Sequence, residues 1–162
     1  METEKAIDTT FSSVLFCTDL SENADHAFPF ALDAVRRRPG SQLHILHVIP
    51  ESGAQFWKSY VYEVEDVDNK AKQDLDARMA ESYLASVSED IPVSVRYRVG
   101  KDWHEILSYA DEIDCGLIVL GRQGKGSIQQ FLNGSVAEKI VRKAKCAVLV
   151  VPLQPSGVGA SI

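Results

Sequence analysis

Short apolar runs alternate along the chain with longer stretches in which apolar residues recur every three or four positions. The apolar runs predict five strands, over residues 13–18, 43–49, 93–99, 117–120 and 147–151. The spaced apolar positions predict four helices, over residues 24–35, 71–87, 102–113 and 135–145. Regular alternation of strand and helix is typical of a parallel sheet with right-handed crossovers. We therefore expect one α/β domain with an open, five-stranded parallel sheet and helices on both faces.

Local signals refine this outline. Ser21 is expected to cap the first helix, which contains Pro29, a residue that should kink the helix or displace its start. The segments 102–105 and 135–138 each resemble a capping box at the start of a helix. The strand over 93–99 alternates apolar and polar residues, so we expect it to lie nearer an edge of the sheet than the others.

Composition narrows the class of protein. The 162 residues carry a formal net charge of −6, which argues against a nucleic-acid surface but not against the binding of one anionic nucleotide. The sequence shows no apolar stretch of about 18 residues and no secretory signal, so we expect a cytoplasmic protein without a membrane span. The three cysteines are far apart in sequence, which favours reduced thiols over a disulfide framework or a zinc site.

Unusual chemistry follows two of the predicted strands. The first strand ends in Thr18 and Asp19, and the fourth runs into a glycine-rich segment, 121–135, that leads to a capped helix. In open parallel sheets, ligands bind beyond the carboxyl ends of the strands, and a helix start attracts anions. The segment fits neither a Walker loop nor the dinucleotide fingerprint. From the residues alone, a phosphate site and a plain glycine-rich surface loop before a capped helix both remain open.

The glycine spacing resembles a known signature. Gly121, Gly124, Gly134 and Ser135 match the pattern G-x2-G-x9-G-[ST], which is similar to the ATP-binding signature of the universal stress protein family. The flanking strands and the closing helix resemble the family as well, over residues 11–152. Cys17 and the Arg122-Gln123 pair depart from the usual residues of the family, but neither removes a backbone amide from the loop. Residues 1–10 and 153–162 are expected to be flexible tails.

The resemblance implies a fold like that of the adenine nucleotide alpha-hydrolases, with strand order 3-2-1-4-5, and ATP as ligand together with Mg²⁺ or Mn²⁺. It implies that Thr18, Asp19 and Val48 contact the adenosine half, Val48 through its backbone, while the loop holds the phosphates. Arg122 and Lys125 are cations that could steady the phosphates. Other interpretations stay open: Asp19 as a helix-start residue, Val48 as core packing, and both cations as exposed loop residues.

Family members commonly pair through the last strand, so the resemblance implies a homodimer, with a further protein partner that the sequence does not identify. The main interpretation is a nucleotide-binding stress-response or regulatory module without efficient catalysis. The alternative is a slow ATP-hydrolysing enzyme that uses the same site. His44 and His47 are three apart on a strand and should face opposite sides of the sheet. Trp57 and Tyr60 could close over the adenine, form a partner surface, or belong to a mobile loop.

Overall fold

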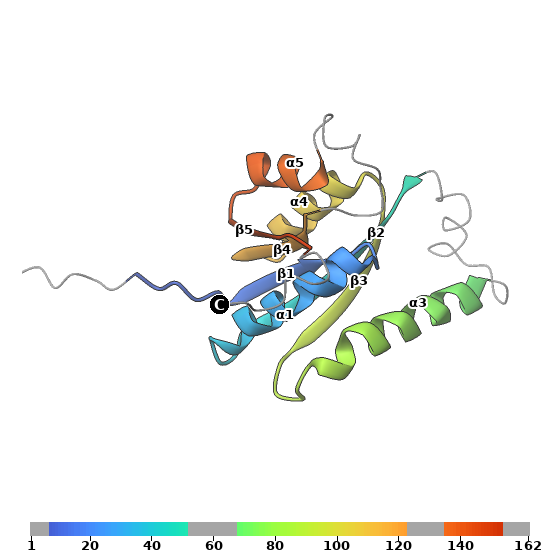
Figure 1. Cartoon of the computed structure of the whole chain (residues 1–162), viewed down its shortest axis with the longest axis horizontal. Helices are drawn as coiled ribbons and strands as arrows, with labels where there is room; N and C mark the ends of the chain where they lie inside the picture. Colours follow the sequence, from blue (N-terminus) through green and yellow to red (C-terminus); the bar gives the residue numbers. More distant parts are fainter. Residues whose placement is uncertain (1–6, 52–67, 123–134, 154–162) are drawn as a thin grey trace, which may run out of the picture.

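The protein folds around a five-stranded, wholly parallel sheet (Figure 1). The computed structural model describes residues 7–51, 68–122 and 135–153. The strands are β1 (Ser13–Cys17), β2 (Gln42–Ile49), β3 (Val93–Val99), β4 (Leu117–Gly121) and β5 (Ala147–Val151). The helices are α1 (Glu22–Arg36), α3 (Asp68–Ser82), the short 3-10 helix η2 (Leu84–Ser86), α4 (Asp102–Glu112) and α5 (Val136–Lys143). Within these residues, no helix combines the length and the apolar character that crossing a bilayer requires.

The strand order is β3-β2-β1-β4-β5, as expected. The central strand β1 is buried along its whole length, and its Phe16 pairs with Ile45 of β2 and Val119 of β4. Its five consecutive buried residues explain the unbroken apolar run, because both faces of a parallel sheet are covered by helices. The alternating strand β3 lies at an edge, as predicted, but β5 lies at the other edge, so β3 is not nearer an edge than every other strand.

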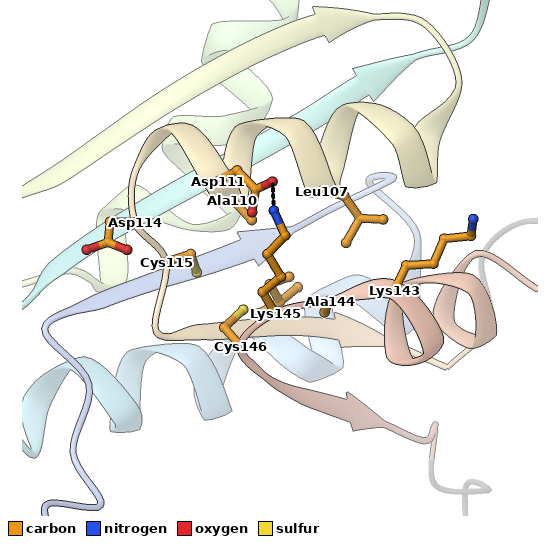
Figure 2. A pocket seen from close by; sticks show the side chains of 10 residues that line it. Leu107, Ala110, Asp111, Asp114, Cys115, Lys143, Ala144, Lys145 and Cys146 are labelled. Carbon is orange, nitrogen blue, oxygen red and sulfur yellow. Dashed lines mark hydrogen bonds and ion pairs between the residues drawn. The ribbon is translucent and has the colours of Figure 1, made fainter.

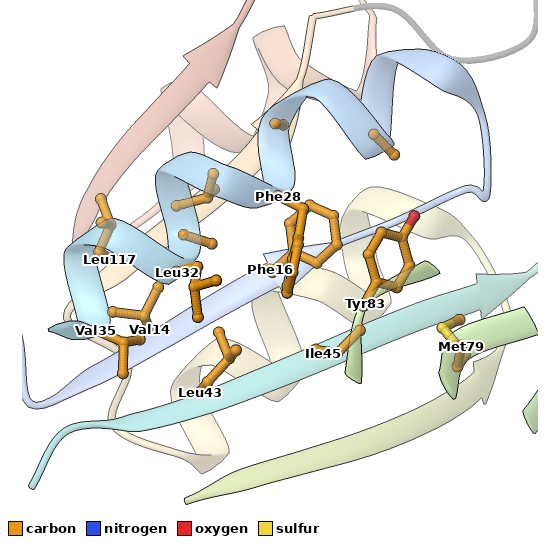
Figure 3. Packing of buried hydrophobic residues seen from close by; sticks show 14 of the residues in the cluster. Val14, Phe16, Phe28, Leu32, Val35, Leu43, Ile45, Met79, Tyr83 and Leu117 are labelled. Atoms are coloured by element: carbon orange, nitrogen blue, oxygen red, sulfur yellow. The ribbon is translucent and has the colours of Figure 1, made fainter. Parts of the chain in front are cut away.

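Helices cover both faces of the sheet. On one face, α1 and the segment from α3 to Tyr83 enclose a core in which the rings of Phe16, Phe28 and Tyr83 meet with centroids 4.9–5.1 Å apart (Figure 3). On the other face, α4 and α5 cover a second core, built from residues such as Leu15, Ile118 and Ile140. The predicted helices on both faces are therefore confirmed. The two cores fix where each helix begins relative to the strand ends.

Pro29 lies inside α1, and of its two expected effects the displaced start does not occur: Ser21 caps the helix as predicted, and the buried apolar stripe outweighs one missing hydrogen bond. Two other predictions about helix ends are wrong. The second helix stops at Ser82 rather than continuing to residue 87, and the chain turns through η2 after Tyr83. The capping box over 102–105 does not form, since Lys101 is the N-cap of α4 and its side chain makes no cap hydrogen bond.

Candidate functional site

The two strands that carry the predicted site are neighbours, but the chain leaves them toward opposite faces of the sheet. After β1 it passes into α1 on one face, and after β4 it leads to α5 on the other. This is the topological switch point, where open parallel sheets bind ligands beyond the carboxyl ends of their strands. The fold therefore brings Thr18 and Asp19 to the same edge as Gly121 and Arg122, as the sequence indicated.

The turn after β1 is held by hydrogen bonds within the protein. The backbone amide of Thr18 donates to the carbonyl of Leu46 at 2.9 Å, and the Thr18 hydroxyl oxygen accepts from the amide of Leu20 at 2.9 Å. Leu20 has a φ of +62°, in the left-handed region that residues with side chains rarely adopt. The carboxylate of Asp19 accepts from the backbone amide of Ser21 at 3.0 Å and also from its hydroxyl. Asp19 itself is exposed at the strand edge.

Gly121, the last residue of β4, has a structural reason to be glycine. A Cβ atom at this position would lie 2.8 Å from the backbone oxygen of Asn23 and 2.9 Å from its carbonyl carbon. Distances this short do not occur between a real Cβ and a backbone. The missing side chain therefore lets the first turn of α1 pack directly on the end of β4, which joins the two walls of the site.

Ser135 opens α5 as predicted. Its hydroxyl oxygen accepts from the amide of Glu138 at 3.2 Å, so it satisfies one of the free N–H groups at the helix start. A hydroxyl group that accepts through its oxygen still has one proton to donate. Capping and donation to a phosphate oxygen are thus compatible for Ser135.

Val48 sits one residue before the end of β2, and its side chain is partly buried against the α4 and α5 face. On one side of β2, the carbonyl of Leu46 accepts from Thr18; on the other, the carbonyl of Ile49 accepts from Gly100 at 3.0 Å. Backbone groups alternate sides along a strand, so those of Val48 point to the β1 side, just beyond the point where β1 has ended. The backbone N–H and C=O of Val48 are therefore placed to offer a ligand one donor and one acceptor.

Arg122 follows directly after β4. Its backbone amide donates to the carbonyl of Val151 at 2.9 Å, which extends the pairing with β5 by one residue, and its side chain is exposed. The fold thus anchors the arginine backbone at the strand edge and leaves the guanidinium in solvent. Gly124, Lys125 and Gly134 lie outside the described residues, as do Trp57 and Tyr60.

Two residues at this edge were not identified as site residues from the sequence. The Nδ1 atom of His47 donates to the carbonyl of Thr18 at 2.8 Å, and the hydroxyl of Tyr83 lies 2.6 Å from that of Thr18. His44 contacts Tyr109 on the other face of the sheet, so the prediction that the two histidines face opposite sides is confirmed. No local pattern marks Tyr83, because its partners lie 58 and 65 residues away in sequence.

A pocket of about 150 Å³ lies elsewhere, at the amino ends of β4 and β5 (Figure 2). Cys115 and Cys146 line it, and Lys145 pairs with Asp111 across its mouth at 3.0 Å. Burial raises the pKa of the Cys115 thiol to about 12 and also raises that of Cys146, so both are protonated at neutral pH. The pocket therefore offers no reactive thiolate, and it does not overlap the predicted site. All three cysteines of the chain are free thiols.

Comparison with known proteins gives a consistent result. The model of the universal stress protein family matches residues 10–152. The relative SSP1056 of Staphylococcus saprophyticus is 31% identical over 144 residues, which are 88% of this chain and 84% of the relative. The solved structure of protein MJ0577 superposes with a TM-score of 0.68 at 25% identity, covering 91% of this chain and 100% of that one. MJ0577 is the universal stress protein of Methanocaldococcus jannaschii.

A further solved structure has a named ligand. It is the universal stress protein of Archaeoglobus fulgidus in complex with dAMP, which superposes with a TM-score of 0.56 at 24% identity, covering 86% of this chain and 95% of that one. At this identity the likeness demonstrates a shared fold.

Proposed function

Because this chain belongs to the universal stress protein family, we propose that it binds an adenine nucleotide, ATP with Mg²⁺ or Mn²⁺, at the carboxyl ends of β1, β2 and β4. One observation carries the proposal: β4, which lies beside β1 at the switch point, is followed in the chain by α5, whose start is capped by Ser135. A helix start presents free N–H groups and a partial positive charge, the features that phosphates require. The dAMP complex of the Archaeoglobus fulgidus protein supports adenine as the base.

Each predicted residue takes a role in this arrangement. The backbone of Val48 offers the adenine edge a donor and an acceptor, and Asp19 accepts from a ribose hydroxyl or lies near the cation. Thr18 acts by shaping the turn, since its hydroxyl, amide and carbonyl all have partners within the protein. The phosphates lie along the loop from Gly121 to Ser135, with Arg122 beside them. Mg²⁺ keeps several waters and binds mainly to the phosphates, so the site needs no cage of protein ligands.

The activity we propose is regulated binding rather than turnover. Efficient hydrolysis requires a residue that positions or activates water and a cation that stabilises the transition state. Arg122, exposed beside the strand edge, is the one cation among the described residues of the proposed site, and it is our candidate for contacting the γ-phosphate. The alternative is therefore a slow ATPase. We expect phosphate release far below about one per second; a faster rate that Arg122→Ala abolishes without loss of ATP binding would establish the enzyme instead.

The binding proposal is tested on the purified protein. Mass spectrometry of the released small molecules identifies the nucleotide carried from the cell, and titration calorimetry with ATP and Mg²⁺ measures its affinity. Gly134→Glu places bulk and negative charge beside the phosphates, and we expect affinity to fall by about tenfold to a hundredfold. Gly134→Ala adds only bulk and should lose less. Gly157→Glu, the same change in the predicted tail, is the control; equal affinity of Gly134→Glu and wild type would refute the assignment.

A further inference from the structure

A buried chain of hydroxyl groups connects the proposed nucleotide site to a distant part of the sequence. Tyr83 follows α3, is fully buried, and its ring packs against Phe16 and Phe28 (Figure 3). Its hydroxyl lies 2.6 Å from the Thr18 hydroxyl and donates to the carboxylate of Asp25 at 2.6 Å. These hydrogen bonds therefore connect the turn after β1, through a residue of the α3–β3 connection, to the first turns of α1.

The direction of each hydrogen bond in this chain follows from its partners. A carboxylate only accepts, so the single proton of Tyr83 is directed to Asp25. The Thr18 hydroxyl must then donate to the Tyr83 oxygen, and its own oxygen accepts from the amide of Leu20 at 2.9 Å. The hydroxyl groups of Thr18 and Tyr83 thus each donate one hydrogen bond and accept one. The arrangement fixes the rotamer of Thr18 and, through it, the amide of Leu20.

The last link holds a backbone that is unfavourable by itself. Leu20 has a φ of +62°, a left-handed conformation that is unfavourable for a residue with a side chain. In this conformation its amide donates to the Thr18 hydroxyl oxygen. Asp19, which lies between these two residues, takes its orientation from the same turn.

We propose that Tyr83 is a positioning residue of the nucleotide site: through Thr18, its hydroxyl sets the turn that presents Asp19 to the ligand. This inference rests on the proposed function. Packing alone would not require the hydroxyl, because a phenylalanine ring would fill the same space beside Phe16 and Phe28. Among the residues that the structure describes, the hydroxyl forms hydrogen bonds at the turn after β1 and at the start of α1, the two segments that form one wall of the site.

The test compares Tyr83→Phe with wild type by titration calorimetry, using ATP and Mg²⁺. We expect affinity to fall by about tenfold, as for the loss of one buried hydrogen bond to a charged group, and hydrogen exchange at the Leu20 amide to accelerate. Tyr97→Phe is the matched control. Tyr97 donates to Asp76 of α3 at the same 2.6 Å, and the variant keeps the ring that contacts His47. It should lose stability without losing affinity.

A double-mutant cycle separates positioning from general weakening. If Tyr83 acts through Thr18, then Thr18→Val combined with Tyr83→Phe should bind ATP no more weakly than Thr18→Val alone, whereas independent effects would add. Should Tyr83→Phe fail to fold, Asp25→Ala removes the acceptor at an exposed position and should weaken binding by about threefold to tenfold. Wild-type affinity in Tyr83→Phe or Asp25→Ala would overturn this inference alone. Absence of ATP binding by the wild type would overturn the proposed function as well.

Discussion

At the scale of single residues, the site depends on one close approach between two backbones. Gly121 allows the first turn of α1 to rest on the end of β4, and Asn23 supplies the backbone atoms on the other side. The glycine was identified from the sequence as part of a loop signature, with a role toward phosphate. The structure adds a packing role that spacing in sequence could not indicate, because the partner lies on another element, almost a hundred residues away.

Gly121→Ala should therefore destabilise the fold. The new Cβ would meet backbone, which cannot move aside as a side chain can, and we expect a loss of about 1–3 kcal/mol of unfolding free energy in urea titrations. Gly116→Ala, one residue before the same strand, is the control. Its Cβ would approach a side-chain atom of Phe11 at 3.3 Å, and the cost should be smaller. Equal losses would contradict the close contact.

His44 should make the stability of the protein depend on pH. Burial, with a smaller contribution from the charge of Arg96, lowers the pKa of His44 below its ordinary value of about 6.5. The unfolded chain then binds more protons than the folded chain as the pH falls through this range, so the stabilisation is present above about pH 6.5 and is lost below it. His44→Leu should show a smaller drop in urea midpoint between pH 7.5 and pH 5 than wild type. An identical drop would exclude His44 as the cause.

At the scale of elements, the start of α5 combines two roles that substitutions can separate. Ser135→Asp keeps a good N-cap, so stability should be retained, but it places a negative charge at the phosphates and should abolish ATP binding. Ser135→Ala removes the cap and should cost about 1 kcal/mol of unfolding free energy with a smaller loss of affinity. Thermal denaturation and calorimetry on the two variants measure both effects. Wild-type affinity for ATP in Ser135→Asp would show that the phosphates do not bind at the start of this helix.

The elements also show what the sequence could and could not predict. All five strands were predicted, four of them from short apolar runs and β3 from its alternation of apolar and polar residues. The end of α3 was placed too late, since Tyr83 keeps the helical spacing but enters the core from a turn. The capping box at α4 was wrong because Glu105 lies within 3.7 Å of Arg98 on β3, a partner from another element. The Tyr83 hydroxyl chain was missed for the same reason: its contacts are long-range.

At the scale of the whole molecule, we expect two copies to pair along the apolar edge strand β5. Leu149 on this edge strand is 37% exposed. Val141 of α5 is 56% exposed, and Leu153, just after β5, is 39% exposed. Leu149→Lys should therefore shift the protein to a monomer in sedimentation experiments at micromolar concentration, without unfolding it. Phe30→Lys makes the same kind of change on α1 and should leave association unaltered. A wild-type protein that sediments as a stable monomer would refute the pairing.

The two edge strands of the sheet differ in polarity, and this difference determines whether the protein can associate beyond a dimer. Along β3 the edge carries the exposed Arg96, while Arg98 is bound to Glu105 and Glu112 of α4. A strand added there would have to bring its backbone alongside these charges, an arrangement that natural sheets use to prevent further pairing. Of the two edge strands, β5 consists wholly of apolar residues, whereas β3 alternates them with polar ones. A fibril grows only when both edge strands of a sheet can pair with further copies. A protein that pairs through one edge strand alone forms a closed dimer, and its association ends there even at high concentration in the cell.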